Sequence, residues 1–284
     1  GVWFTRLKAR GSLDPYRGDF MLVMIKGAGD LASGIACCLI RAGHQVIMTE
    51  IARPTVVRRT VSFAVAAEQG NAQLEEIRGR LADSPDQALA MAGQGIAAVL
   101  IDPETRCLKA LQPDVLVDAI IAKHNTGTCK TDAPLVIAIG PGFVAGEDCH
   151  AAVESQRGPN LGQVLWQGSP EPDSGVPGPV LGYDKERIIR APGDGVFIPL
   201  AAIGDIVEKG RPVARVGDQL AQAQLTGLVR GMLAKGTIVT KGMKSGDIDP
   251  RIEPELCYHI SDKALAIGEG VLQAIKDFGG WSHD

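Results

Sequence analysis

"MLVMIKGAGDLASG", residues 21–34, decides the fold expected for this chain. It opens with an apolar run at 22–25, which is typical of a strand buried on both faces. The glycine-rich "GAGDLA" that follows matches the GxGxxG/A pattern of a strand-to-helix turn. A helical stretch at 31–42 and a second apolar strand at 44–50 complete a β-turn-α-β unit of about 30 residues, the size of a mononucleotide-binding half.

The glycine turn predicts an anion site. Its first glycine permits a tight turn, its second lets a phosphate approach the backbone, and the following helix N-terminus favours negative charge. Asp30 opposes a phosphate, unless it serves as the helix N-cap. An acid about 20 residues after the turn would accept ribose hydroxyls. The residues expected to bind a cofactor here are Gly27, Ala28, Gly29, Asp30, Leu31 and Glu50. The alternative is a turn kept for packing alone.

Three further apolar stretches, at 97–102, 114–120 and 134–140, predict buried strands. Helical sequences at 84–95 and 103–113 lie between them. Strands that alternate with helices indicate a parallel sheet whose ligand crevice lies at the carboxyl ends of the strands.

Polar residues follow several of these strands. Arg58 and Arg59 form either an anion clamp or a solvated helix face, and adjacent positions would send at most one of them to a given ligand. Lys123, in the loop after the strand at 114–120, could be a phosphate anchor, a proton donor or an amine nucleophile. Glu154 and Arg157, after the next strand, could pair across one helical turn.

The C-terminal half contains a repeat. "GVFIPLAAIGDIVEKG" at 195–210 and "GLVRGMLAKGTIVTKG" at 227–242 share glycine, isoleucine, valine and lysine positions at a constant offset of 32 residues (227 − 195). A two-copy repeat of short strands indicates a pseudo-symmetric β structure, and this one resembles the biotinyl/lipoyl-type barrel-sandwich hybrid. The hairpin "RVGDQLAQAQ" at 215–224 lacks the lysine to which such carriers attach a prosthetic group. We therefore expect no covalently carried cofactor.

The expected fold is α/β: a Rossmann-like doubly wound parallel sheet with a small β barrel-sandwich-hybrid domain. An amphipathic helix from about Ser261 is expected to pack back on the first domain. The expected divisions are an N-terminal extension at 1–20, a Rossmann-like domain at 21–143, a loop or linker with a lid at 144–189, the barrel-sandwich domain at 190–250 and the C-terminal helix at 251–284.

Composition narrows the class of protein. A net charge of −4 and a pI near 5.8 argue against a nucleic-acid binder. No apolar run reaches the roughly 18 residues that span a bilayer. The six cysteines form no CxxC pair, so we expect no metal site and free thiols in a reducing cytoplasm.

Nine motifs in order between residues 21 and 278 resemble the YqeB family, the selenium-dependent molybdenum hydroxylase system protein. They are "KGAGDLASGIACCL", "TEIARPTVVRRTVSF", "LVDAIIAKHNTGT", "IAIGPGFVAGEDC", "VESQRGPNLG", "SGVPGPVLGY", "ERIIRAP", "GDIDPR" and "ISDKALAIGEGVL". The chain departs from the family at Ser155 and Pro159, where the family has threonine and histidine.

The resemblance implies a cytoplasmic accessory protein in the maturation of selenium-dependent molybdenum hydroxylases. Its partners would be the hydroxylase, other maturation proteins and a small phosphate-bearing ligand. The candidate cofactors are a molybdopterin nucleotide or NAD(P), bound in the Rossmann crevice with help from Arg58 or Arg59. The candidates for the reactive end of the ligand are Lys123, Asn125, Glu154 and Arg157.

Two alternatives stay open. One is an NAD(P)-dependent oxidoreductase, with Glu50 favouring NAD. The other is a non-catalytic scaffold whose barrel-sandwich domain docks the hydroxylase. The sequence leaves open whether the protein is an enzyme and whether it forms a homo-oligomer.

Overall fold

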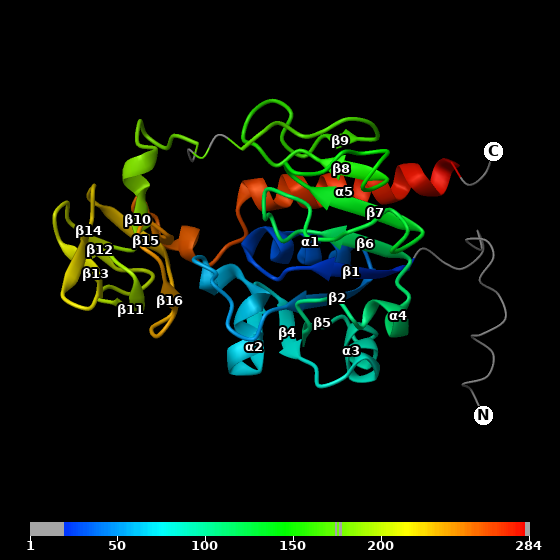
Figure 1. Ribbon diagram of the computed structural model, residues 1–284, viewed down its shortest axis with the longest axis horizontal. Helices are drawn as coiled ribbons and strands as arrows, with labels where there is room; N and C mark the ends of the chain where they lie inside the picture. The colour runs from blue at the N-terminus through cyan, green and yellow to red at the C-terminus, as the bar shows by residue number, and fades with distance from the viewer. Residues whose placement is uncertain (1–19, 174, 176–177, 282–284) are drawn as a thin grey trace.

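The computed structural model describes residues 20–173, 175 and 178–281. The chain forms two units that lie side by side, a larger one built on a nine-stranded sheet and a smaller one built on two four-stranded sheets (Figure 1). The expected N-terminal extension at 1–20 lies outside the described residues, except for Phe20.

The central strands of the large sheet are the ones that the apolar runs predict. The sheet order is β3-β4-β5-β2-β1-β6-β7-β8-β9, and the strands from β4 to β8 in this order run parallel to one another. Their bounds are β1 Leu22–Lys26, β2 Gln45–Glu50, β4 Ile77–Leu81, β5 Ala97–Ile101, β6 Val115–Asp118, β7 Leu135–Ile139 and β8 Ala151–Val153. The two edge strands, β3 Asn71–Leu74 and β9 Val164–Leu165, are antiparallel to their neighbours.

Helices cover both faces of this sheet. On one face α1 (Asp30–Arg41) and α5 (Asp262–Trp281) pack against alternate strand residues such as Val23 and Ile25. On the other face α3 (Pro85–Ala92) and α4 (Leu108–Leu111) share a core with Met24. The remaining short helices of this unit are α2 (Ala66–Gln69), η1 (Arg59–Val61) and η2 (Phe63–Val65).

Helices α1 and α5 run parallel and in close contact. A Cβ atom on Gly34 would lie 2.5 Å from the Cβ of Ala264, and one on Gly268 would lie 2.5 Å from the Sγ of Cys38. Residue numbers increase in the same direction along both helices, because Gly34 contacts Ala264 and, one turn later, Cys38 contacts Gly268. The two N-termini therefore lie next to each other, and this places the start of α5 beside the glycine turn.

We expect Gly270→Ala to lower the free energy of unfolding by about 1–3 kcal/mol, as overpacking does. A Cβ there would collide with the backbone carbonyl oxygen of Gly162, which cannot rotate away. Gly279→Ala, on the same helix, is the matched control, because its Cβ meets nothing within 4 Å. Urea unfolding of both variants checks this. Equal stability of the two would show that α5 has room to shift.

The smaller unit consists of two antiparallel sheets around Phe197. One has the order β10-β17-β15-β12 and the other β14-β13-β11-β16. The strands are β10 Ile188–Arg190, β11 Gly195–Pro199, β12 Ile206–Val207, β13 Pro212–Val216, β14 Gln219–Gln222, β15 Gly227–Met232, β16 Ile238–Val239 and β17 Lys244–Asp249. The repeat is visible in the pairing, since β12 of the first copy pairs with β15 and β16 of the second copy pairs with β11. Short helices η3 (Lys185–Arg187) and η4 (Pro254–Cys257) flank this unit.

The predicted fold class, a Rossmann-like doubly wound parallel sheet with a barrel-sandwich hybrid, was wrong. The large sheet is mixed, because the β3–β4 hairpin and β9 add antiparallel edges. Its connections also differ from those of a Rossmann-like sheet: loops rather than helices join β6 to β7 and β7 to β8, and α5 enters from the far end of the chain. The loop at 119–134 contains Asn125, Gly127, Asp132 and Pro134, residue types that favour turns over a crossover helix. The smaller unit is a pair of four-stranded antiparallel sheets, one of which includes β10 from outside the repeat.

Candidate functional site

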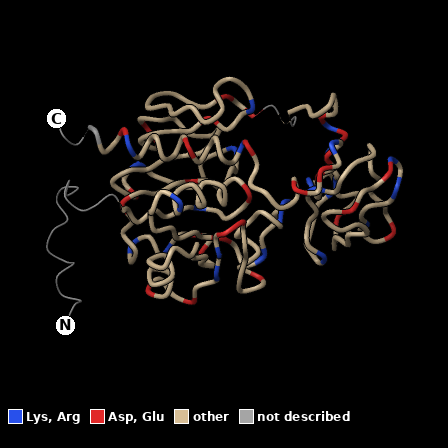
Figure 2. Tube along the Cα trace, turned by 180° about the vertical axis from the view of Figure 1, so that it is seen from behind, with Lys and Arg blue, Asp and Glu red and all other residues tan. Residues whose placement is uncertain are grey.

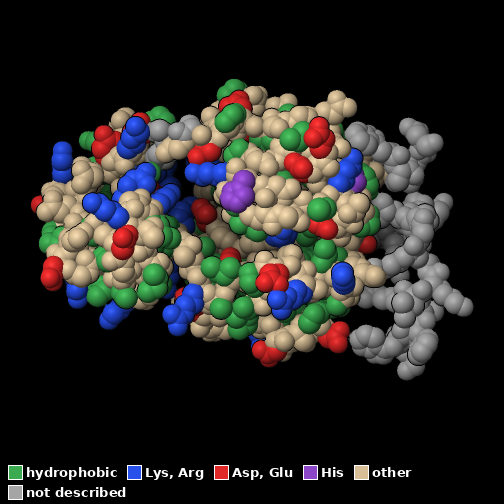
Figure 3. Space-filling model, viewed as in Figure 1, with side chains coloured by type: hydrophobic (Ala, Val, Ile, Leu, Met, Phe, Trp, Pro, Cys, Tyr) green, Lys and Arg blue, Asp and Glu red, His purple; other side chains and the backbone are tan. Residues whose placement is uncertain are grey.

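A cleft of about 1150 Å³ lies between the two units. Figure 3 shows it as a hollow with Lys and Arg side chains at its rim. The larger unit contributes residues that follow the carboxyl ends of its parallel strands, among them Glu50, Ala119 and Pro141. The smaller unit contributes β15 and β17, and α5 contributes its first turn. The cleft therefore lies where a parallel sheet places its ligands.

Positive charge exceeds negative charge in the cleft, and charged residues of both signs gather where the two units meet (Figure 2). No aromatic ring lines it among the described residues. The cationic residues are Lys26, Arg58, Lys123, Arg157, Arg187, Arg190, Arg230, Lys244, Arg251 and Lys263. The acidic residues are Asp30, Glu50, Glu171, Asp173, Asp184, Asp247 and Asp262.

The glycine turn lies at one wall of the cleft. Gly27 has a φ of +92°, and a Cβ there would lie 3.0 Å from the carbonyl oxygen of Ala119, so only glycine fits. The carboxylate of Glu50 accepts hydrogen bonds from the amides of Ala28, at 3.0 Å, and Ile51, at 2.8 Å. Burial raises the pKa of the Glu50 carboxyl. Glu50 thus accepts a hydrogen bond from one amide of the turn.

Five of the six residues predicted around the turn line the cleft, and Ala28 does not, because it is completely buried. Of the two predicted arginines, one lines the cleft and the other does not. Arg58 lines the cleft and is 8% exposed, and its Nη2 donates to the carbonyl of Leu256 at 2.7 Å. Burial lowers the pKa of Arg58. Arg59 starts η1 and lies outside the cleft.

Lys123 and Asn125 belong to the same loop, but only Lys123 lines the cleft. Lys123 has a φ of +66°, lines the cleft and forms an ion pair with Asp173 at 2.5 Å. Asn125 lies outside the cleft. Its Oδ1 accepts the amides of Gly127 and Thr128, so its side chain shapes the loop.

Glu154 and Arg157 do not pair with each other, because the residues directly after β8 form a loop and not the helix that the prediction required. Glu154 is buried outside the cleft and accepts the amides of Gln156 and Glu171, each at 2.7 Å. Arg157 lines the cleft and forms a bidentate pair with Asp262, with both distances at 2.8 Å. Glu154 therefore joins two loops, whereas Arg157 joins the loop after β8 to α5.

Sequence reasoning missed the contribution of the smaller unit. Asp249 on β17 is completely buried, and its carboxylate binds Arg251 through Nε at 2.9 Å and Nη2 at 2.7 Å. Asp247 accepts from the Nε of Arg230 at 2.7 Å and lies 3.4 Å from the Nη2 of Arg187. The motif "GDIDPR" contains both carboxylates and Arg251, but only the pairing of β17 with β15 and β10 brings Arg230 and Arg187 to them.

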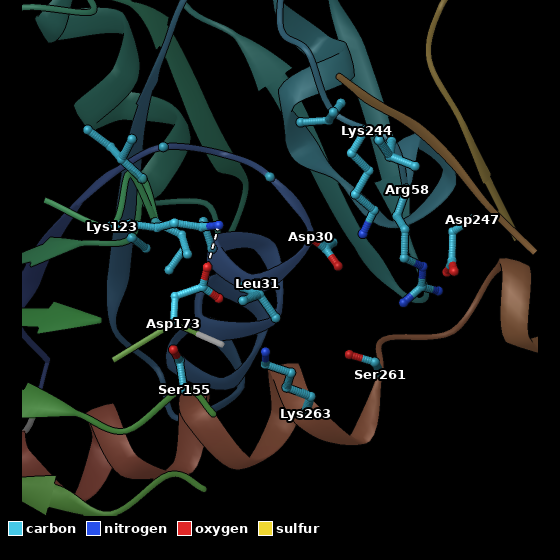
Figure 4. Close-up of a pocket in the computed structure, with 18 of the residues that line it drawn as sticks. Asp30, Leu31, Arg58, Lys123, Ser155, Asp173, Lys244, Asp247, Ser261 and Lys263 are labelled. Carbon is cyan, nitrogen blue, oxygen red and sulfur yellow. Dashed lines mark ion pairs between the residues drawn. The ribbon is translucent and has the colours of Figure 1, made fainter. Parts of the chain in front are cut away.

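Sequence reasoning also missed Lys244 and Lys263. Figure 4 shows both amino groups directed into the space in front of Asp30, at the N-terminus of α1. Lys263 lies in the first turn of α5, where the Ser261 hydroxyl accepts the amide of Ala264 at 3.1 Å. Burial, with the neighbouring charge of Arg157, lowers the pKa of Lys263. The predicted N-cap at Ser261 placed this lysine on a helix, but no sequence signal pairs that helix with α1.

No family model matches the chain. It is 47% identical over 254 residues to the "Uncharacterized protein YqeB" of Escherichia coli (strain K12), an alignment that covers 89% of this chain and 47% of that protein. The chain thus spans about half the length of this relative. The identity supports the resemblance to the YqeB family.

Among solved structures, the chain is similar to the ectoine utilization protein EutE (DoeB) from Ruegeria pomeroyi, with 13% identity, a TM-score of 0.26 and coverage of 80% of this chain and 86% of that one. It is also similar to a succinylglutamate desuccinylase/aspartoacylase from Rhodobacter sphaeroides, with 14% identity, a TM-score of 0.26 and coverage of 80% and 84%. Likenesses of this size assign no activity to the chain.

The predicted role in maturation of selenium-dependent molybdenum hydroxylases was wrong on these comparisons, as were the oxidoreductase and scaffold alternatives. The printed name of the relative from Escherichia coli assigns no activity, so it gives the maturation role no support. Within the described residues, no helix combines the length and hydrophobicity needed to cross a membrane.

Proposed function

We propose that the protein binds a small, multiply charged anion, bearing phosphate or carboxylate groups, in the cleft between its two units. The observation that carries this is the convergence of Lys244 and Lys263 on the adjacent N-termini of α1 and α5. Helix N-termini present amide donors and favour negative charge, and two parallel helices add their effects.

Most other cations of the cleft already have carboxylate partners. Lys123 pairs with Asp173 and Arg157 with Asp262. Lys244 and Lys263 have no carboxylate within ion-pair distance among the described residues. Asp30, which lies between them in Figure 4, can accept a hydrogen bond from a hydroxyl of the ligand. A hydroxylated phosphate ester or a hydroxy acid fits this combination.

Isothermal titration calorimetry of the full chain against pyrophosphate, citrate and glycerol tests the proposal. We expect heat of binding with the two anions and none with glycerol, and weaker affinity as salt increases, because salt screens charge. Lys244→Ala should weaken anion binding about 10-fold, the equivalent of one charge-assisted contact of about 1.4 kcal/mol.

Lys241→Ala is the matched control. Lys241 is exposed in the turn just before β17 and does not line the cleft. Its removal changes the net charge as Lys244→Ala does, so it should leave the affinity nearly unchanged. Equal weakening by both variants, or no heat with either anion at low salt, would refute the proposal.

A further inference from the structure

Four lysines line the cleft, and their surroundings differ. Lys26 is buried, donates to the Thr128 hydroxyl at 2.6 Å and lies 3.5 Å from Asp118. Lys123 is paired with Asp173. Lys244 is exposed on β17. Lys263 is the half-buried lysine of the set that lacks a carboxylate within ion-pair distance among the described residues.

Burial and neighbouring charges lower the pKa of the Lys263 amine. Arg157 and Lys244 bring positive charge near it, and Asp30 and Asp173 bring negative charge. Asp173 is shared with Lys123, and the carboxylate next to Lys263 in the chain, Asp262, is held by Arg157. Burial and cationic neighbours are the conditions that activate lysine as a nucleophile.

The position of Lys263 is also rigid. It lies in the first turn of α5, which is held against α1 by the contacts of Gly34 with Ala264 and of Gly268 with Cys38. Figure 4 shows its amino group directed into the cleft, toward the space bordered by Asp30. A ligand whose charges rest on the two helix N-termini and on Lys244 would hold its remaining groups within reach of this amine.

We propose that Lys263 forms an imine with the carbonyl group of a small anionic aldehyde or 2-oxo acid bound in the cleft. The inference rests on the proposed function, since it requires that the cleft bind an anion. The neutral amine attacks the carbonyl carbon, and the carbonyl oxygen takes up a proton to give a carbinolamine. The oxygen then leaves as water. Its two hydrogens balance the two that the nitrogen loses, one when the carbinolamine forms and one when the imine forms. The sum is amine plus carbonyl to imine plus water, and no redox partner is needed. Asp30 is placed to relay the proton.

Reductive trapping tests this. The full chain is incubated with glyoxylate or pyruvate and cyanoborohydride, digested and mapped by mass spectrometry. We expect a secondary-amine adduct at Lys263 at least 10-fold above that at Lys276, an exposed lysine on the same helix. Lys263→Arg should lose the adduct, whereas Lys276→Arg should keep it. Mapping on the unaltered chain decides the matter even where a variant fails to fold.

Pyrophosphate has no carbonyl group and separates the two proposals. It should suppress trapping at Lys263 when it binds. Calorimetric binding of pyrophosphate without an adduct above the Lys276 level would overturn the imine and leave anion binding intact. Absence of both would overturn both. An adduct at Lys263 that saturating pyrophosphate does not reduce would overturn the link to the cleft.

Discussion

Asp249→Asn is expected to lower the free energy of unfolding by about 3–5 kcal/mol, because breaking a buried ion pair leaves uncompensated charge. Asp249 is completely buried, and its carboxylate is shared by Arg251, by Arg230 at 3.4 Å and by Arg187 at 4.0 Å. Asparagine keeps the shape but not the charge, so Arg187 and Arg230 would depend on Asp247 alone and Arg251 would lose its carboxylate partner.

Guanidinium unfolding, followed by circular dichroism, measures the loss. Asp218→Asn is the matched control, since Asp218 is exposed in the turn between β13 and β14, and we expect a change within about 0.5 kcal/mol for it. A loss below 1 kcal/mol for Asp249→Asn would mean that water compensates the arginines.

The same carboxylate gives a pH dependence. Hydrogen bonds from Arg251, acting against burial, lower the pKa of Asp249 from 3.8 to about 2. A depressed folded-state pKa contributes stability that is complete above the unfolded-state pKa and is lost as pH falls toward the folded-state value, here about 2 kcal/mol. Stability of the unaltered chain should therefore fall between about pH 4 and pH 2, and Asp249→Asn should flatten that part of the curve.

Lys26→Met should cost a similar amount, about 3–5 kcal/mol, for the same reason at the other unit. Lys26 and Asp118 are 5% and 2% exposed at the carboxyl ends of neighbouring strands β1 and β6. Thr128 connects them: its hydroxyl accepts from Lys26 at 2.6 Å and donates to Asp118 at 2.5 Å. Methionine fills the space of the lysine stem but leaves the aspartate charge buried.

A second change tests the cause. Lys26→Met with Asp118→Asn removes both charges, and we expect the double variant to recover most of the loss, as replaced buried pairs often do. Lys109→Met, at an exposed position on α4, controls for the added methionine. Urea unfolding of the set gives the coupling. If the losses of the two single variants simply add in the double variant, Lys26 does not stabilise the protein through its pair with Asp118.

The sequence predicted the elements whose side chains are buried on both faces. β1, β2, β5, β6 and β7 all lie where apolar runs place them, and the turn at Gly27 adopts the positive φ expected of it. Ser261 was also recognised as the start of a helix. These features are local, since strand burial, turn geometry and capping depend on a few neighbouring residues.

What sequence could not supply is the pairing between distant segments. β3 and β9 are short edge strands with mixed polarity, so no apolar run marks them. Asn125 and Glu154 have residue types common in active sites, yet both accept hydrogen bonds from backbone amides of loops. Conversely, Lys263 is about 230 residues from Asp30 in the chain (263 − 30). It lies near the glycine turn because α5 packs against α1 through Gly34 and Gly268.

No aromatic ring lines the cleft in the part of the chain that the structure describes, and this has a practical consequence. Trp166, the tryptophan whose side chain the structure describes, packs against the core on the α1 face and does not line the cleft. Energy absorbed by its indole is emitted from an environment that an incoming anion does not touch. An optical screen that reads emission from this residue would therefore score an occupied cleft as an empty one.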